Sequence, residues 1–361
     1  MPRINFNNKN PRFYKSLQKE VEAYFRLKNL KPTGNIELYF KAFLFISFAF
    51  TSYIFLLFGN YNAGIGIVLC IIMGLTLAGI AMNVMHDACH GSFSQRKWIN
   101  TLTGLTMNAL GSNAFLWKIK HNIIHHTYTN IATVDSDIEN WPLLRQTPVQ
   151  KCLRIHRYQH LYMFLLYAVT TLHWMLIFDF EKYFTRRFAS TMVRNISLTE
   201  HVLFWLSKIL YVTFYIAIPI TLLGWQAWLI GFLIVHTSMG VVLTTIFQLA
   251  HLVEKTTIEN GESQKLIDRE WAIHELMTTA DFATGNKVLN WYLGGLNFQV
   301  EHHLFPRISH IHYPALNSIV KRECSRFGIS YHCYDTLREA IFSHVRLMKK
   351  LGQNNVVSGK L

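Results

Sequence analysis

Two long stretches of this chain contain no Asp, Glu, Lys or Arg, and this feature constrains the fold more than any other. They cover residues 42–86 and 209–253, which is 45 residues each. The apolar core of a bilayer is about 30 Å thick and takes roughly 20 helical residues to cross. Each stretch therefore predicts a hairpin of two spans, and uncharged turn sequences at 59–62 and 224–226 fall near the two midpoints.

Basic residues flank both stretches. The first 37 residues contain eight Lys or Arg and three acids, and the segment between the hairpins and the C-terminal tail are also basic. Since basic flanks favour the cytoplasmic face, we expect the two termini and both ends of each hairpin to be cytoplasmic. The net charge of +14 then reflects attraction to membrane lipid; no nucleic-acid-binding motif accompanies it, and we expect no nucleic-acid partner. Four of these residues could bind a phosphate-bearing head group, but lipid-surface charges are the simpler reading: Arg96, Lys97, Lys118 and Lys120.

Seven of the eighteen histidines form three tight groups. The groups are His86 with His90, His121 with His125 and His126, and His302 with His303. On a helix, residues four positions apart share a face, so the first two groups can each present paired imidazoles to one site. Adjacent residues point about 100° apart, so the neighbouring histidines of the second and third groups could serve a second metal ion. An eighth histidine, His251, ends the last predicted span, where an extended helix would carry it into the same site. Four isolated histidines are more simply read as hydrogen-bonded core or surface residues: His160, His173, His201 and His236.

Residues 98–117 and 158–178 are also uncharged and long enough to span. A single crossing at either place would separate the histidine groups onto opposite faces of the membrane. We therefore predict that both stretches are interfacial segments. The predicted fold is an all-α integral membrane protein with a cytoplasmic histidine domain. Its parts are a cytoplasmic segment at 1–40, a membrane domain at 41–350 with spans near 41–58, 64–85, 204–223 and 227–250, and a flexible tail at 351–361.

The number of clustered histidines indicates how many metal ions the site could hold and of which kind. Imidazole suits zinc, copper, nickel and iron alike, but eight imidazoles exceed what one four-coordinate zinc can take, so two ions are implied. Open positions at paired iron would suit O2 activation, and the glutamates of soluble di-iron carboxylate proteins are missing. Four acids are candidates to accept a ligand's other N–H, and each could equally be an ordinary surface acid: Asp87, Asp135, Asp137 and Glu301.

Three segments carry a resemblance to a known family. They are 83–92 (NVMHDACHGS), 117–130 (WKIKHNIIHHTYTN) and 294–306 (GGLNFQVEHHLFP). They resemble the three histidine boxes of membrane fatty acid desaturases, and the similarity extends over roughly residues 35–350. The resemblance implies four transmembrane helices under a cytoplasmic helical cap, two iron ions between them, and O2 as co-substrate. Asn83, in the first segment, is a further candidate ligand or neighbour of a ligand.

Gln299 departs from the commonest family pattern, which has histidine at this position. Glutamine here resembles the front-end subgroup, which inserts a double bond between an existing one and the carboxyl end, as Δ5, Δ6 and sphingolipid Δ8 enzymes do. Gln299 could be a weak amide ligand or only a hydrogen-bonding neighbour. Many eukaryotic front-end enzymes carry a fused cytochrome b5 domain with a His-Pro-Gly-Gly motif, and the 40 residues before the first predicted span contain no such motif.

These features define the expected activity and partners. We expect an acyl-CoA or acyl-lipid substrate, held in a narrow apolar tunnel, and two electrons from a separate ferredoxin or cytochrome b5 type donor with its reductase. The membrane would be a bacterial inner membrane, or that of the endoplasmic reticulum in a eukaryote. The alternative is a membrane di-iron hydroxylase or ketolase, which would insert oxygen instead. A transporter or metal permease would place ionisable groups inside the spans, whereas both uncharged stretches have none.

Overall fold

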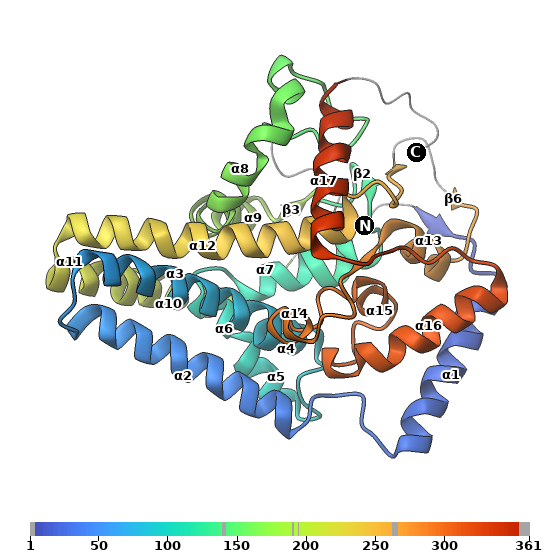
Figure 1. Ribbon diagram of the computed structural model, residues 1–361, viewed down its shortest axis with the longest axis horizontal. Helices are drawn as coiled ribbons and strands as arrows, with labels where there is room; N and C mark the ends of the chain where they lie inside the picture. The colour runs from blue at the N-terminus through green and yellow to red at the C-terminus, as the bar shows by residue number, and fades with distance from the viewer. Residues whose placement is uncertain (1–3, 139–141, 190, 194, 262–265, 354–361) are drawn as a thin grey trace.

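The computed structural model describes residues 4–138, 142–189, 191–193, 195–261 and 266–353, and most of these are helical. In Figure 1 the long helices α2, α3, α10 and α12 run beside one another on the left, with the short α11 at their far end, and shorter elements gather on the right. The predicted tail at 351–361 lies almost wholly outside the described residues.

Two helical hairpins match the two uncharged stretches. In the first, α2 (Ile36–Phe58) is followed by α3 (Ala63–Ile80), which continues through the π-helical η1 (Ala81–Met85) into α4 (His86–His90). In the second, α10 (Leu198–Val212), η5 (Thr213–Ala217) and α11 (Ile218–Leu223) precede α12 (Trp225–His251). The second turn requires glycine, because Gly224 has a φ of 82°. Asn62 caps α3 by accepting a hydrogen bond from the N–H of Ile65.

A fifth helical stretch is also long and apolar enough to cross a membrane. It consists of η3 (Arg154–Tyr158), α8 (Gln159–His173), η4 (Trp174–Phe178) and α9 (Asp179–Thr185). Together these have 32 residues, and an 18-residue window within them has a mean hydropathy of 1.7. Among the described residues five helices meet this standard, one more than the sequence predicted. In Figure 1, α8 rises steeply away from α12, whereas α3 and α10 run along it.

Residues 98–117 do not form one long helix. The chain there folds into α5 (Lys97–Gly104), α6 (Thr106–Ala109) and α7 (Ala114–Lys118), of eight, four and five residues. Each is far shorter than the roughly 20 residues that a crossing requires.

The remaining elements form a cap over one end of the long helices (Figure 1). Its helices are α1 (Arg12–Lys28), η2 (Ile119–His125), α13 (Trp271–Thr278), α14 (Lys287–Tyr292), α15 (Gln299–Leu304), η6 (His310–His312), α16 (Tyr313–Phe327) and α17 (Leu337–Gly352). Parallel pairs of two-residue strands join distant segments: β1 (Asn5–Phe6) with β6 (Leu266–Ile267), β2 (Ile131–Ala132) with β5 (Glu259–Asn260), and β7 (Asp281–Phe282) with β8 (Cys333–Tyr334). An antiparallel pair joins β3 (Arg187–Phe188) and β4 (Thr191–Met192). Apolar side chains of α1, including the buried Phe13 and Leu17, pack with Leu316 of α16 and Leu276 of α13.

The helices α8, α12 and α17 are held tightly together. A Cβ atom added to Gly240 of α12 would lie 2.6 Å from the carbonyl oxygen of Ala168 and 2.8 Å from that of Tyr167, so the two helix backbones touch. The hydroxyl of the buried Tyr167 lies 2.8 Å from Nε2 of His344 in α17. The Nδ1 of His344 in turn donates to the carbonyl oxygen of Leu252, just beyond α12. A small residue such as glycine lets two helix backbones approach this closely.

We predict that Gly240→Ala lowers the stability of the protein by about 1 to 3 kcal/mol, because the added methyl group meets backbone that cannot move aside. The matched control is Gly231→Ala on the same helix, where the nearest atom to the new Cβ would be Sγ of Cys70 at 3.3 Å. That change should be close to neutral. Replacing a helical glycine by alanine favours the helix by roughly 0.5 to 1 kcal/mol, and this gain offsets the tight contact with Cys70. Thermal unfolding in detergent micelles measures both, and equal midpoints for the two variants would contradict the crossing.

Candidate metal centre

Eight histidines from four elements meet in one buried cluster. They come from α4, from η2 and the residue after it, from the end of α12, and from α15. The eight are His86, His90, His121, His125, His126, His251, His302 and His303. No more than 9% of any of them is exposed. The structure therefore brings together every histidine that the sequence proposed as a ligand, including His251.

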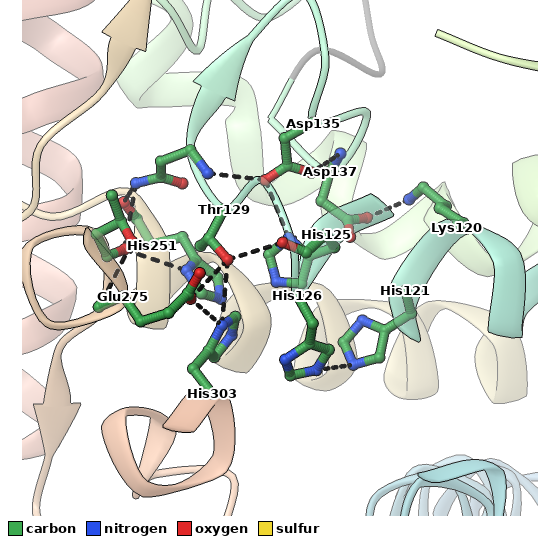
Figure 2. Close-up of polar contacts among 12 residues, drawn as sticks. Lys120, His121, His125, His126, Thr129, Asp135, Asp137, His251, Glu275 and His303 are labelled. Carbon is green, nitrogen blue, oxygen red and sulfur yellow. Dashed lines mark hydrogen bonds and ion pairs between the residues drawn. The ribbon is translucent and has the colours of Figure 1, made fainter. Parts of the chain in front are cut away.

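The second histidine group lies on a π-helix and not on the α-helix that the spacing predicted. In η2 the N–H of His126 donates to the carbonyl oxygen of His121, five residues earlier, at 3.1 Å. A turn of this width places residues four and five positions on almost equally close to the first residue. As a result Nε2 of His126 lies 3.2 Å from Nε2 of His121, although the α-helical expectation had His126 pointing away from the face shared by His121 and His125 (Figure 2).

The imidazole nitrogens gather in several overlapping groups, each with its atoms within 4.8 Å of one another. One group is His86, His90, His121 and His302; another is His125, His251 and His303; a third is His126, His302 and His303; and Asp137 joins His121 and His125 in a fourth. His125 and the adjacent His126 fall into different groups, whereas His302 and His303 are divided between the first and second groups but share the third. Two neighbouring cation sites are consistent with this division.

Several nitrogens in the cluster lack any hydrogen-bond partner in the described part of the chain. They are Nε2 of His86, His90, His251, His302 and His303, and Nδ1 of His126. A buried polar atom left unsatisfied costs about 1 to 3 kcal/mol, so a fold that buries six such atoms side by side is expensive unless something binds them. Lone pairs of neutral imidazoles are the donors that transition metals take. The donor set therefore fits metal ions.

The pKa values of these imidazoles favour the metal-binding form. Burial, followed by repulsion from neighbouring imidazoles, lowers the pKa of His121, His126, His302 and His303 well below the usual value. His125 differs: burial lowers its pKa, but the carboxylates of Asp135 and Asp137 more than offset this and raise it to about 9. Because a metal ion binds only the unprotonated ring, occupation of this position would release a proton.

An aspartate orients His125. Nδ1 of His125 donates to Oδ2 of Asp135 at 2.9 Å, and the backbone N–H of Asn130 donates to the same oxygen at 2.9 Å (Figure 2). With Nδ1 engaged, Nε2 is left to face the cluster. Asn130 also joins distant segments, because its side chain donates to the carbonyl oxygens of His251, at 2.8 Å, and Thr257, at 3.0 Å.

Other ligand candidates have partners that sequence reasoning missed. Nδ1 of His303 donates to Glu275 at 2.8 Å, and the hydroxyl of Thr129 lies 3.2 Å from the same nitrogen. Nδ1 of His302 lies 3.1 Å from the hydroxyl of Tyr313. Thr129 lies in a segment that resembles the family and Tyr313 lies just after one, so the sequence offered a signal for both. Nothing in the sequence connects Glu275 with His303, 28 residues away.

Lys120 and Asp137 form an ion pair at the edge of the cluster. Lys120 is buried, and its ammonium group lies 4.7 Å from the centre of the Trp174 ring. Asp137 also approaches Nδ1 of His125 to 3.5 Å. The expectation that Lys120 is a lipid-surface charge is therefore wrong, because its carboxylate partner and aromatic neighbour hold it inside the protein.

The other proposed polar residues lie close to the cluster but bond elsewhere. Asp87 accepts from the hydroxyl of Ser309 at 2.7 Å and stays 4.0 Å from Nδ1 of His86. Asn83 donates to the carbonyl oxygens of Gly79 and Tyr292, and Gln299 donates to that of Leu296.

Glu301 belongs to a separate buried network. It accepts from Tyr331 at 3.0 Å and from Asn317 at 3.3 Å, and both of these also donate to Asp281. Burial raises the pKa of Asp281 to about 6 and that of Glu301 well above its usual value. We expected Glu301 to accept a hydrogen bond from a ligand histidine. In the structure it bonds to Tyr331 and Asn317 instead, because its side chain leaves α15 on the side facing α16.

An apolar cavity adjoins the cluster. It has a volume of about 150 Å³, and His121, His125 and His251 form part of its wall. Most other lining residues are apolar, among them Met85 of η1, Leu243 of α12 and Trp174 of η4. An apolar group would fit beside imidazoles that are able to hold metal ions.

Apolar helices, a buried centre able to bind metal ions and an adjoining apolar cavity are together the features of a lipid-modifying oxidoreductase. The chain belongs to the fatty acid desaturase family, whose sequence model matches residues 63–335. It is therefore an enzyme that introduces a double bond into a fatty acyl chain.

Characterised relatives cover almost the whole chain. An sn-1 linoleoyl-lipid 6-desaturase of Arthrospira platensis is 33% identical over 95% of this chain and 93% of its own length. An enzyme of the same name from Synechocystis sp. is 35% identical over 97% of this chain and 98% of its own. An acyl-lipid (8-3)-desaturase of Physcomitrium patens is 29% identical over 95% of this chain and 72% of its own.

We predict that Asp135→Asn weakens metal binding about 10- to 100-fold, because an amide in place of the carboxylate no longer fixes the ring of His125. The control is Asp335→Asn, the same chemical change at an exposed site before α17. Titration of the purified metal-free protein with ferrous iron against a competing chelator measures both affinities. Equal affinities would show that Asp135 does not orient a ligand.

Proposed function

We propose that this enzyme is a front-end acyl-lipid desaturase of the Δ6 type. The observation that carries the proposal is the apolar cavity that ends at His121, His125 and His251, because only such a cavity can position an unactivated methylene beside a metal centre. The relatives named linoleoyl-lipid 6-desaturases support both the Δ6 position and a lipid-linked substrate. Gln299 in the third histidine segment, a feature of front-end enzymes, agrees with them.

We further propose that two iron ions occupy the cluster. His86, His90, His121 and His302 would hold one, and His125, His251 and His303 the other, with His126 next to both groups. The unsatisfied Nε2 atoms of five of these residues support this assignment. When bound, the irons would supply the redox chemistry that uses O2 and two electrons to remove two hydrogens from the acyl chain.

The protein's own residues would position the substrate and the ligands. The apolar wall of the cavity would hold the chain extended and keep water away, since a methylene offers no charge or hydrogen-bonding group. Asp135 and Glu275 would keep Nδ1 of His125 and His303 protonated, so that Nε2 faces the centre. The ion pair of Lys120 with Asp137 would seal one polar edge of the same cavity.

We also propose four membrane crossings, a cytoplasmic cap and a separate electron donor. His126 and His251 lie in one cluster, so the chain between them crosses the membrane an even number of times. Three candidate helices lie in this interval. The helices on either side of Gly224 form a tight hairpin beside α3, whereas α8 stands steeply to them (Figure 1), which supports α8 as an interfacial helix.

The activity can be tested by expressing the chain in a host fed oleate and linoleate, with the fatty acids analysed by gas chromatography and double-bond location. We expect new bonds at Δ6, and a complete loss of them in the His125→Ala, His126→Ala variant. The control is His201→Ala, outside the cluster, where Nδ1 pairs with the hydroxyl of Tyr183 at 2.6 Å. Products with bonds beyond the existing ones would contradict a front-end enzyme, and hydroxylated products would favour the hydroxylase alternative.

The topology can be tested with single cysteines and a membrane-impermeant maleimide, in a variant whose native Cys152 and Cys333 are replaced by serine. Cysteines at Lys151 and Arg187 flank the stretch that contains α8, and both positions are exposed. We expect both to react from the cytoplasmic side only, whereas a cysteine at the exposed Asn60, in the first hairpin turn, reacts from the other side. Opposite labelling at Lys151 and Arg187 would mean that α8 crosses the membrane.

A further inference from the structure

The helix that carries His302 and His303 is too short to hold its own position. It is α15, with six residues, and the residue before it, Phe298, has no polar side chain that could cap it. Isolated helices shorter than about 12 to 15 residues are marginal in water, and the first backbone N–H groups of any helix have no partner within the helix. The orientation of both imidazoles therefore depends on what α15 contacts in the rest of the cap.

Asp281 of β7 caps α15 from a distant part of the chain. Its Oδ1 accepts a hydrogen bond from the backbone N–H of Val300 at 2.9 Å, across 19 residues. A carboxylate at this end of a helix also interacts favourably with the helix dipole. The backbone N–H of Asp281 in turn donates to the carbonyl oxygen of His332 at 2.9 Å, beside the pairing of β7 with β8. The cap is thus fixed to another element and does not move with α15.

The second oxygen of Asp281 is held by two donors. The side-chain amide of Asn317, in α16, donates to Oδ2 at 3.0 Å, and the hydroxyl of Tyr331 donates to the same atom. Both donors also bind Oε1 of Glu301, which directly precedes His302. Asp281 and Glu301 are fully buried, so water does not compete for these bonds. The network therefore holds α15 at its first turn and again at its middle.

The network lies beside the metal centre and not within it. Asp281, Asn317 and Tyr331 belong to none of the imidazole groups. In the part of the chain that the structure describes, their side chains bond to one another, to Glu301 and to the backbone of α15, and to no histidine of the cluster. A change in this network would leave all eight imidazoles in the protein and alter only how α15 is held.

We propose that Asp281, held by Asn317 and Tyr331, is a positioning residue for the metal centre, because it fixes the helix that presents His302 and His303. The inference rests on the proposed occupation of the cluster by metal ions, and it adds a residue that acts through backbone and touches no ring. Since His302 belongs to one proposed set of ligands and His303 to the other, a displaced α15 disturbs both cation sites together.

The test titrates the purified metal-free protein with cobalt(II), whose visible absorption bands report the geometry of its ligands without any turnover. In Asp281→Ala the affinity for cobalt should fall about 10- to 100-fold, the range found when a group that orients ligands is lost, and the bands should change. Asp281→Asn keeps an oxygen that can accept from Val300 and should recover most of the affinity. Tyr331→Phe removes one donor to Asp281 and should lower the affinity by a smaller factor.

The matched control is Glu323→Ala, which also removes a buried carboxylate from the cap. Glu323 lies in α16 and accepts from the hydroxyl of Ser16 in α1 at 2.7 Å, so it joins two helices that carry no ligand. This variant should unfold at a lower temperature, because it loses a buried contact, and should keep the cobalt affinity and bands of the unchanged protein. The comparison separates a role in positioning from a role in stability alone.

A folded Asp281→Ala protein with unchanged affinity and bands would overturn the proposal, and so would an equal change in Glu323→Ala. If Asp281→Ala does not fold, Tyr331→Phe decides, and unchanged cobalt binding in that variant overturns the proposal. An unchanged protein that binds no cobalt would refute the metal assignment and this inference with it. That result differs from cobalt binding that is insensitive to Asp281, which would refute the inference alone.

Discussion

The burial of eight imidazoles in one place is the constraint on which the rest of the structure depends. Five of their Nε2 atoms have no hydrogen-bond partner among the described residues, so the chain bears an energetic cost that bound cations would offset. To gather them, the ends of two hairpins, a π-helical turn and a short helix near the C-terminus must meet. The paired strands and the bonds from Asn130 to the end of α12 are the means by which these distant segments are held in register.

The same cluster relates the site to the membrane. A centre at the end of the long helices leaves their apolar length free to line a cavity, and the apolar cavity beside His251 lies there. The methylene that reacts offers no charge or hydrogen-bonding group, so selectivity falls to the shape of the cavity.

Much of this could be predicted from the sequence. The two hairpins are predicted by uncharged stretches of sequence, which are a local property. The histidine cluster is predicted by the spacing of the histidines. Three features could not be predicted, each for a physical reason. The π-helical turn of η2 changes which face His126 shares, and residue spacing does not distinguish it from an α-helix. The bond of Glu275 to His303 depends on tertiary folding. The partners of Glu301 are Asn317 and Tyr331, and that of Lys120 is Asp137; all three lie in other segments and are brought close only by tertiary folding. A fifth apolar helix also shows that hydropathy alone does not decide between crossing the membrane and lying at its surface.

Asn130 has a consequence for how the protein is made. Its backbone is left-handed, with a φ of 56°, and its side chain reaches carbonyl oxygens of residues 251 and 257, which are synthesised more than a hundred residues later. The first two histidine groups therefore leave the ribosome well before the contacts that hold them in place exist. A cation can be held by the full ligand set only after both hairpins are inserted and the chain has been synthesised past residue 303. Ligands stabilise only the states that bind them, so metal loading would be the last step of biogenesis and would selectively preserve chains whose membrane insertion is complete.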